Sequence, residues 1–202
     1  MSVVVAIKDG NKVFIGADSQ VTKGGTRTTL KNPNNYKIWK VDDSPNCLMA
    51  QVGNLRDANV VRLMSNIIDD YDEFYNRVNY RFVVKFLVPE IVKTLKEAGF
   101  LKTSDNFVDY MESSFLFAYK DKLFNINSDC SVIEVDDYVA IGSGSQEAIG
   151  SLLSTEGLSP KERIIKAIKS SATNDIYVDY PIILTDTETG EFEIISEKEI
   201  EK

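Results

Sequence analysis

The sequence predicts an α+β fold of four layers, in which two antiparallel β-sheets pack face to face and a pair of helices covers each outer side. Three observations predict it. Short apolar runs with strand alternation are joined by tight turns, as in antiparallel sheets. Helical periodicity is confined to two separate blocks, and the order is hairpins, two helices, a meander, two helices and final strands. No repeat or linker interrupts this order, so we expect a single domain over residues 1–202.

The composition is that of an ordinary globular domain. Of 202 residues, 43% are apolar and 27% are charged, which suffices for a sizeable core. The 23 basic and 31 acidic residues give a net charge of -8, which disfavours nucleic-acid and anionic-membrane partners. No apolar run reaches the roughly 18 residues that span a membrane, and no export leader is present. We therefore expect a cytoplasmic protein with neither kind of partner.

The chain opens with two apolar runs, Val3–Ile7 and Val13–Ala17, which flank a polar turn and predict a buried β-hairpin. Ser2 precedes the first strand, so removal of Met1 would place its hydroxyl beside a free α-amine. Asp18 follows the second strand, where the hairpin brings it close to the start of the first. Asp18 either bonds turn amides at this strand end or takes part in the chemistry of Ser2, and the hairpin pattern alone leaves both readings open.

The absence of histidine limits the chemistry more than any other feature of the composition. It excludes Ser-His-Asp and Cys-His catalysis and all His-ligated metal sites. The base of a hydrolase must then be a carboxylate, a lysine or the α-amino group, whose pKa of about 7.7 to 8.0 suits proton transfer near neutral pH. Cys47 and Cys130 lie in apolar, strand-like surroundings without a CxxC motif. We expect them to be buried thiols, with no disulfide, metal or cofactor.

A second hairpin is predicted for Tyr36–Val41 and Cys47–Val52, and Gly53 ends it. Strand alternation places Lys37 on the same face as Trp39, and a lysine that points inward needs a partner. Alternatively, Lys37 lies at the strand entrance and its ammonium group reaches water. Between the two hairpins, residues 20–29 are expected to form a loop or an exposed ribbon.

Apolar residues at three- and four-residue steps predict a long helix from Leu55 to Asn79. A second helix is predicted from about Val83 to Ala98, with a late start or kink at Pro89 and a C-cap at Gly99. The apolar stripe of the long helix widens toward its end, so that part is either core or a contact with another subunit. This stripe consists of Tyr71, Phe74, Tyr75 and Val78.

The second half of the chain begins with four short strands that we expect to form a meander. They are Ser114–Tyr119, Lys122–Asn127, Ser131–Val135 and Tyr138–Ile141. Small residues around Ser143 then form a strand-to-helix corner that permits a close backbone approach. Ser159 and Glu162 form a capping box that starts another helix, which ends before Asp175. The final strands are expected near residues 182–185 and 191–195.

These segments resemble the proteasome β subunit and its bacterial relative HslV, members of the N-terminal-nucleophile hydrolase superfamily. Ser2 and the strand after it look like the family's first strand, which begins at a threonine or serine nucleophile. Gly16-Ala17-Asp18-Ser19 resembles the family's acidic strand end, and Lys37 falls at the position of its catalytic lysine. Ala50-Gln51-Val52-Gly53, with Asp57 beyond, resembles the segment whose glycine amide forms the oxyanion hole.

The likeness continues through the second half of the chain. Gly142-Ser143-Gly144-Ser145 is similar to the family's Gly-Ser-Gly signature, which places Ser143 at the position of the catalytic serine. Asp175 resembles the aspartate that supports this serine. Gln51 falls at a position that lines the primary specificity pocket, which implies a less purely apolar pocket. The sequence differs from the family pattern at one position, where Val178 replaces the second serine that proteasome subunits usually carry.

The resemblance implies an N-terminal-nucleophile hydrolase fold and an endopeptidase that needs no cofactor. Ser2 would be the nucleophile after removal of Met1, and Lys37, held by Asp18, would be a fixed positive charge beside it. Gly53 N–H would bind the oxyanion, and Ser143 and Asp175 would orient the amine. The resemblance further implies polypeptide substrates, a hexameric or heptameric ring that is most often double, and an unfolding ATPase partner.

Two other functions are weighed against this reading. The first is a non-catalytic subunit of the same fold that only builds the assembly, which Met1 and Val178 favour. A scaffold needs none of the polar site residues, however, and their presence favours the enzyme. The second is an amidase of the same superfamily that acts on a small amide, which the proteasome-type motifs disfavour.

Overall fold

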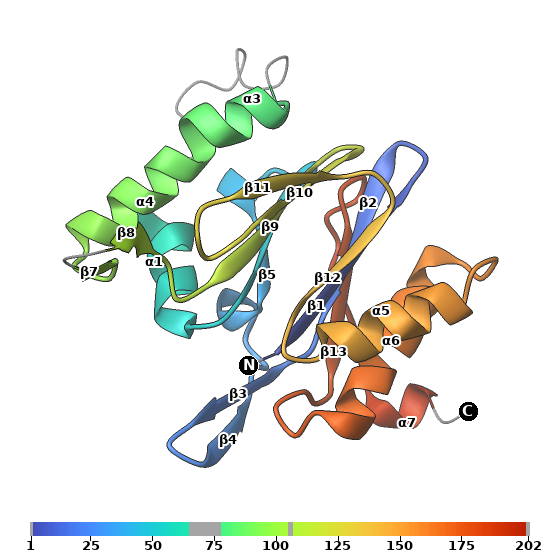
Figure 1. Cartoon of the computed structure of the whole chain (residues 1–202). Coiled ribbons are helices and arrows are strands. Elements are labelled where there is room, and N and C mark those ends of the chain that lie inside the picture. The colour runs from blue at the N-terminus through green and yellow to red at the C-terminus, as the bar shows by residue number, and fades with distance from the viewer. Residues whose placement is uncertain (1, 65–77, 105–106, 201–202) are drawn as a thin grey trace.

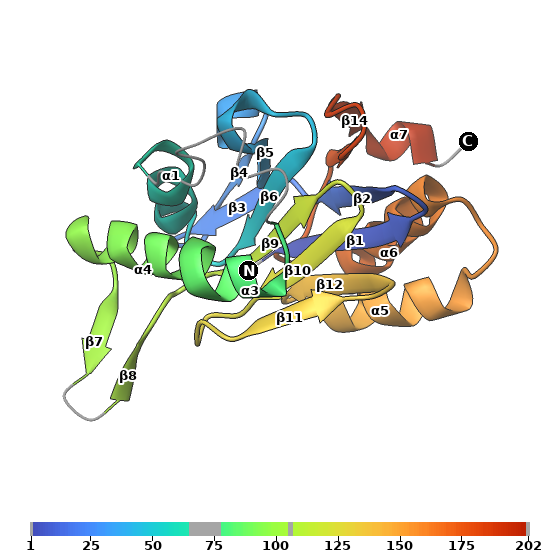
Figure 2. The same cartoon turned by 90° about the horizontal axis from the view of Figure 1, so that it is seen from above.

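The computed structural model describes residues 2–64, 78–104 and 107–200, and it has the predicted four layers (Figure 1). Two five-stranded antiparallel sheets pack face to face, and helices cover both outer faces (Figure 2). The first sheet contains, in spatial order, β12 (Tyr138–Gly142), β1 (Val3–Asp9), β2 (Lys12–Ala17), β13 (Ile182–Asp186) and β14 (Glu193–Ile195). The second contains β11 (Val132–Val135), β10 (Lys122–Ile126), β9 (Ser114–Tyr119), β6 (Cys47–Val52) and β5 (Ile38–Lys40).

The remaining strands form two small sheets outside the sandwich. They are β3 (Gln20–Lys23) with β4 (Thr26–Thr29), and β7 (Lys102–Ser104) with β8 (Phe107–Tyr110). The β3–β4 pair is the expected exposed ribbon and projects away from the two main sheets (Figure 1).

The helices also divide between the two faces. The second sheet is covered by α1 (Leu55–Met64) and by a continuous helical segment of α3 (Tyr80–Phe82), a π-helical turn η3 (Val83–Leu87) and α4 (Val88–Glu97). The first sheet is covered by α5 (Ser145–Ser154) and α6 (Pro160–Asn174). Short elements are the 3₁₀ turns η1 (Pro33–Asn35) and η2 (Val41–Asp43) and the terminal helix α7 (Glu197–Ile200). No helix in the described ranges is long and apolar enough to cross a membrane.

Strand alternation in β1 explains why apolar side chains form a layer on each face of the first sheet. Val4 and Ala6 point into the core between the two sheets, where they meet Leu116 and Ala118 of β9. Their neighbours in β1 point the other way and pack under α5 and α6. Because both faces of β1 are buried, its sequence is a continuous apolar run instead of an alternating one.

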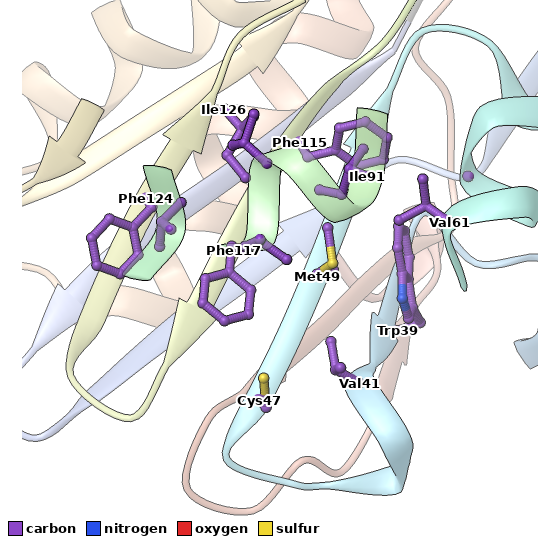
Figure 3. Close-up of a cluster of buried hydrophobic side chains, with 14 of the residues drawn as sticks. Trp39, Val41, Cys47, Met49, Val61, Ile91, Phe115, Phe117, Phe124 and Ile126 are labelled. Carbon is purple, nitrogen blue, oxygen red and sulfur yellow. The ribbon is translucent and has the colours of Figure 1, made fainter. Parts of the chain in front are cut away.

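The third apolar layer lies between the second sheet and the helices α1 and α4. Alternate residues of the central strands supply it, with Met49 from β6 and Phe115 and Phe117 from β9 (Figure 3). The helices contribute Val61 and Ile91, both fully buried. This layer holds β6 against the helices, and the residues that follow β6 belong to the candidate active site described below.

The two helices predicted between Leu55 and Ala98 differ from the structure. The long predicted helix is described only as far as Met64, and Tyr71, Phe74 and Tyr75 lie outside the described residues. At its predicted end, Val78 and Asn79 are not helical, and the Asn79 side chain instead accepts the Phe82 N–H as the N-cap of α3. The second predicted helix therefore begins three residues early, at Tyr80.

The π-helical turn has a physical cause in Pro89. Proline has no N–H to donate to the carbonyl four residues back, and its ring crowds that carbonyl. The turn before it widens so that the Val88 N–H bonds the carbonyl of Val83, five residues back. Gly99 ends the helix as predicted, with φ of +74°.

The predicted meander is only partly correct. The first three of its strands pair in sequence as β9, β10 and β11, but β12 leaves this sheet and pairs with β1 in the other one. Cys47 is fully buried as expected, whereas Cys130 is only partly buried, in the turn before β11. Neither sulfur forms a disulfide.

Candidate active site

Sheet pairing brings Ser2 and Ser143 together from opposite ends of the chain. In the register of β1 with β12, Val3 lies opposite Gly142, so the residues just outside these two are neighbours. Ser143 Oγ accepts a hydrogen bond from the Ser2 backbone N–H at 3.0 Å and lies 3.3 Å from the Ser2 carbonyl oxygen, to which it can donate. The predicted nucleophile is thus held at its backbone nitrogen, the atom that would become the α-amine.

Small residues are required where β12 approaches Ser2. Gly142 has φ of +103°, and a Cβ built there would lie 2.1 Å from the Ser2 carbonyl oxygen. A Cβ on Gly144 would lie 2.7 Å from the Ser171 Cβ of α6. The Gly-Ser-Gly corner therefore allows the backbone of Ser143 to lie against both Ser2 and α6.

Asp18 occupies the end of β2 and receives several donors. One carboxylate oxygen accepts the Val3 N–H at 3.0 Å, and the other accepts the Gln20 N–H at 2.9 Å. The first oxygen also lies 2.6 Å from Lys37 Nζ. Asp18 thus forms the expected strand-end bonds and at the same time holds the predicted catalytic lysine.

Lys37 is 3% exposed, and its ammonium group donates to Asp18 and to the Gln20 carbonyl, both at 2.6 Å. The expected inward-pointing lysine with a partner is confirmed, because Lys37 is buried and paired with Asp18. Lys37 lies just before β5, and its ammonium reaches Asp18 at the end of the first sheet, whereas Trp39 packs between the second sheet and its helices. The alternative, in which the ammonium reaches water, is wrong.

Burial is the main influence on the pKa of Lys37 and lowers it from its ordinary value. The carboxylates of Asp18 and Asp175 oppose this effect and raise the pKa. Burial thus disfavours the charged form of Lys37, and its two acidic neighbours favour it.

Asp175 caps the end of α6 and faces the site from the helical layer. One of its carboxylate oxygens accepts the Tyr177 N–H at 2.9 Å. The other is buried and has no hydrogen-bond partner among the described residues. The structure places the charge of Asp175 near Lys37 but shows no bond from it to Ser143. Val178, the residue that differs from the family pattern, is buried under the first sheet and packs against Gly144.

Gly53 ends β6 with φ of +116°, a conformation that favours glycine. A Cβ there would lie 2.4 Å from the carbonyl oxygen of Glu112. Within the described ranges, the Gly53 N–H makes no hydrogen bond. It is therefore available to an acceptor in the adjacent cleft.

Four of the predicted residues line one cleft of about 720 Å³, namely Ser2, Lys37, Gln51 and Gly53. Most of the residues that line the cleft have polar side chains. The remaining lining residues are Gln20, Val21, Thr22, Lys23, Asn54, Leu55, Arg56, Asn59 and Glu112. Gln51 is almost fully buried in the wall, and its amide nitrogen bonds Ser113 Oγ and the Asn54 carbonyl. The cleft lining does not include Asp18, Ser143 or Asp175.

Sequence reasoning missed one set of polar contacts beside Gly53. Ser113, just before β9, bonds Asp57 in the first turn of α1 at 2.8 Å. In the sequence, Asp57 stands only at the end of a family-like segment, and Ser113 lies in a stretch without periodicity. No sequence signal joins the two, because Ser113 comes beside Gly53 only through the pairing of β9 with β6.

Comparisons with known proteins agree with this geometry. The family model described as proteasome subunit matches residues 2–182. The ATP-dependent protease subunit HslV of Caldicellulosiruptor saccharolyticus is 28% identical over 180 residues, which cover 87% of this chain and 92% of that protein. HslV of Borrelia turicatae is 28% identical over 189 residues, covering 90% and 94%.

Solved structures show the same fold at lower identity. The Thiobacillus denitrificans protein BPH has a TM-score of 0.71 and 17% identity, covering 93% of this chain and 98% of that one. The eukaryotic HslV of Trypanosoma brucei has a TM-score of 0.64 and 20% identity, covering 91% and 98%. The chain therefore belongs to the proteasome subunit family and is an HslV-like member with the N-terminal-nucleophile hydrolase fold.

Proposed function

We propose that this chain is the catalytic subunit of an HslV-like peptidase and cleaves polypeptides with Ser2 as the nucleophile, once Met1 has been removed. Membership of the family makes the chain an N-terminal-nucleophile endopeptidase. The observation that supports the serine assignment is the position of Ser2. Its nitrogen bonds Ser143, and it shares one cleft with Lys37 and with Gly53, whose N–H makes no hydrogen bond among the described residues.

In the proposed reaction, Ser2 Oγ attacks the carbonyl carbon of the scissile peptide bond, and the α-amine of Ser2 takes the hydroxyl proton directly or through water. The carbonyl oxygen becomes an oxyanion that accepts the Gly53 N–H. The protonated amine then gives its proton to the leaving nitrogen, and the C–N bond breaks to leave an ester on Ser2. Water hydrolyses this ester by the same sequence of steps and restores the hydroxyl.

Lys37 and Ser143 have distinct roles in this proposal. The positive charge of Lys37 lowers the pKa of the hydroxyl and of the amine, because a nearby cation favours the more negative form of each. Ser143 Oγ fixes the direction of the amine through the 3.0 Å contact. The Asp175 oxygen that has no hydrogen-bond partner among the described residues supplies negative charge that balances the protonated amine during the reaction.

The test of this function combines intact mass measurement with two variants at one position. Natively expressed protein should lack the mass of Met1 and should hydrolyse unstructured polypeptides. Ser2→Thr should retain turnover because it keeps the hydroxyl, whereas Ser2→Ala should have none while folding normally. Quantitative retention of Met1, or turnover by Ser2→Ala, would overturn the serine assignment. An assembled but inactive protein would indicate the non-catalytic subunit instead.

The proposed assembly is a hexameric or heptameric ring, stacked in pairs and fed by an unfolding ATPase. Closed rings form when one surface of a subunit packs on a different surface of the next. The layer formed by α1 and α3–α4 exposes large apolar side chains, with Leu63 80% exposed and Phe86 63% exposed. Sedimentation at micromolar concentration should show a ring, and a protein that stays monomeric or dimeric would exclude this proposal.

A further inference from the structure

The turn after β6 leaves the sheet at Gly53, a residue that lines the cleft. The pairing of β6 with β9 ends at Val52 and Ser114. Gly53 then turns outward with φ of +116°, and its N–H makes no bond to any residue that the structure describes. A single glycine at the end of a strand has many accessible conformations, so something must hold this one.

One oxygen atom holds both sides of the turn. Ser113 Oγ accepts the Asn54 backbone N–H at 3.1 Å and the Gln51 side-chain N–H at 2.9 Å. Gln51 precedes Gly53 by two residues, and Asn54 follows it directly. The Gln51 side chain before Gly53 and the Asn54 backbone after it are therefore tied to the same hydroxyl.

The hydroxyl proton of Ser113 has its own acceptor, Asp57 Oδ2 at 2.8 Å. Asp57 is 0% exposed, and Arg56 Nε lies 3.8 Å from its other oxygen. A buried carboxylate is costly unless it is bonded, and an apolar residue in the first turn of α1 would pack without that cost. The carboxylate orients the Ser113 hydroxyl so that the oxygen lone pairs point at the two donors.

We propose that Ser113 and Asp57 are positioning residues for the oxyanion site, which fix the turn that directs the Gly53 N–H into the cleft. The inference rests on the proposed peptidase function and adds two residues that do not touch the substrate. Its rival is a purely structural role, in which the same bonds only close the end of the β6–β9 pair. The two differ because an oxyanion site acts on the transition state and leaves substrate binding nearly unchanged.

The experiment compares Ser113→Ala with Ser114→Ala, a matched change at the neighbouring residue. The fraction of subunits with a reactive Ser2 is first measured by mass after labelling with a peptide vinyl sulfone. Addition of the Ser2 hydroxyl to this reagent forms no carbonyl oxyanion, so the labelled fraction does not depend on the oxyanion site. Per labelled site, Ser113→Ala should lower kcat by about 10- to 100-fold, with KM changed by less than about twofold. Binding of a peptide aldehyde, whose adduct places an oxygen in the oxyanion site, should weaken by a similar factor. Ser114→Ala should match the wild type in all three measurements.

Asp57→Asn is the second variant, because it keeps the shape and an acceptor oxygen and therefore folds where larger changes fail. It should retain more kcat than Ser113→Ala. Unchanged kcat and aldehyde binding per labelled site in Ser113→Ala would overturn the inference and leave the peptidase function intact. A wild type that neither hydrolyses polypeptide nor labels at Ser2 would instead overturn the peptidase function.

Hydrogen exchange supplies a readout that does not depend on activity. In Ser113→Ala, deuterium uptake should rise in the peptide that spans residues 51–57, while the rest of β6 and β9 keeps its protection. A rise spread over both strands would show the purely structural role. Unchanged uptake would show that Ser113 does not hold the turn, and either result would overturn the inference.

Discussion

The ammonium of Lys37 lies 2.6 Å from a carboxylate oxygen of Asp18, and both side chains are almost completely buried. The pair joins the two sheets, because Asp18 ends β2 in the first and Lys37 leads into β5 in the second. Asp18 also accepts the N–H of Val3, the residue after Ser2. The same carboxylate thus contacts both Lys37 and the backbone next to Ser2, the proposed nucleophile.

The first prediction separates the charge of Lys37 from its structural role. Lys37→Met should abolish peptide hydrolysis and lower the free energy of unfolding by about 3 kcal/mol, because it leaves Asp18 buried without its ion-pair partner. The double variant Asp18→Asn/Lys37→Met should recover much of the stability and none of the activity. Denaturant unfolding and turnover of the three proteins check this. Activity in the double variant would contradict a catalytic role for the charge.

The second prediction concerns the contact between Ser143 and the nitrogen of Ser2. Ser143→Ala removes the 3.0 Å partner that orients this nitrogen. The kcat should fall by about tenfold or more, with a smaller change in KM, since amine orientation matters most during proton transfer. Ser145→Ala, two residues along in the first turn of α5, is the control and should behave as the wild type. Equal kcat values for both variants would argue against the assigned role of Ser143.

The third prediction tests the close approach at Gly142 with a glycine control in the adjacent helix. Gly142→Ala would place a Cβ 2.1 Å from the Ser2 carbonyl oxygen and should displace Ser2, with loss of activity. Gly150→Ala in α5 meets nothing within 4 Å and should raise the free energy of unfolding by about 0.5 to 1 kcal/mol. Turnover and thermal unfolding of both variants give the comparison. A fully active Gly142→Ala protein would show that the corner tolerates a side chain.

The fourth prediction is a pH dependence that originates in Asp57. Burial raises the pKa of Asp57 above its value of about 3.9 in an unfolded chain, although Ser113 and Arg56 oppose the shift and Glu112 adds to it. A raised folded pKa gives stability that is present below the unfolded pKa and lost as pH rises through the folded pKa. The wild type should therefore lose stability relative to Asp57→Asn as pH increases from about 4 toward neutral. Thermal unfolding of both proteins across this range measures the difference, and a constant difference would show that Asp57 does not titrate there.

Local chemistry explains why so much of the fold could be predicted from the sequence. The first hairpin follows from two apolar runs around a polar turn, and α6 begins at a capping box of Ser159 and Glu162 that the structure contains in full. The absence of histidine left a carboxylate, a lysine or the α-amine as the base, and family-like segments in the sequence contain Asp18, Lys37, Gly53 and Ser143. Each of these signals lies within a few residues, where backbone preference and hydrogen bonding are decided locally.

The tertiary structure decided what depends on partners distant in the chain. Alternation placed Lys37 beside Trp39, but the residue lies just before the strand, and its buried ammonium pairs with the carboxylate of Asp18 in the other sheet. β12 joins the first sheet because it pairs with β1, and this pairing brings Ser143 to Ser2 across 141 residues of sequence. The bond from Ser113 to Asp57 spans 56 residues, and no local pattern specifies it. The sequence by itself determined which elements form and which groups are available for catalysis. Sheet pairing and the burial of charge determined which of those groups meet. Both sheet pairing and charge burial depend on contacts that exist only once the two sheets have packed.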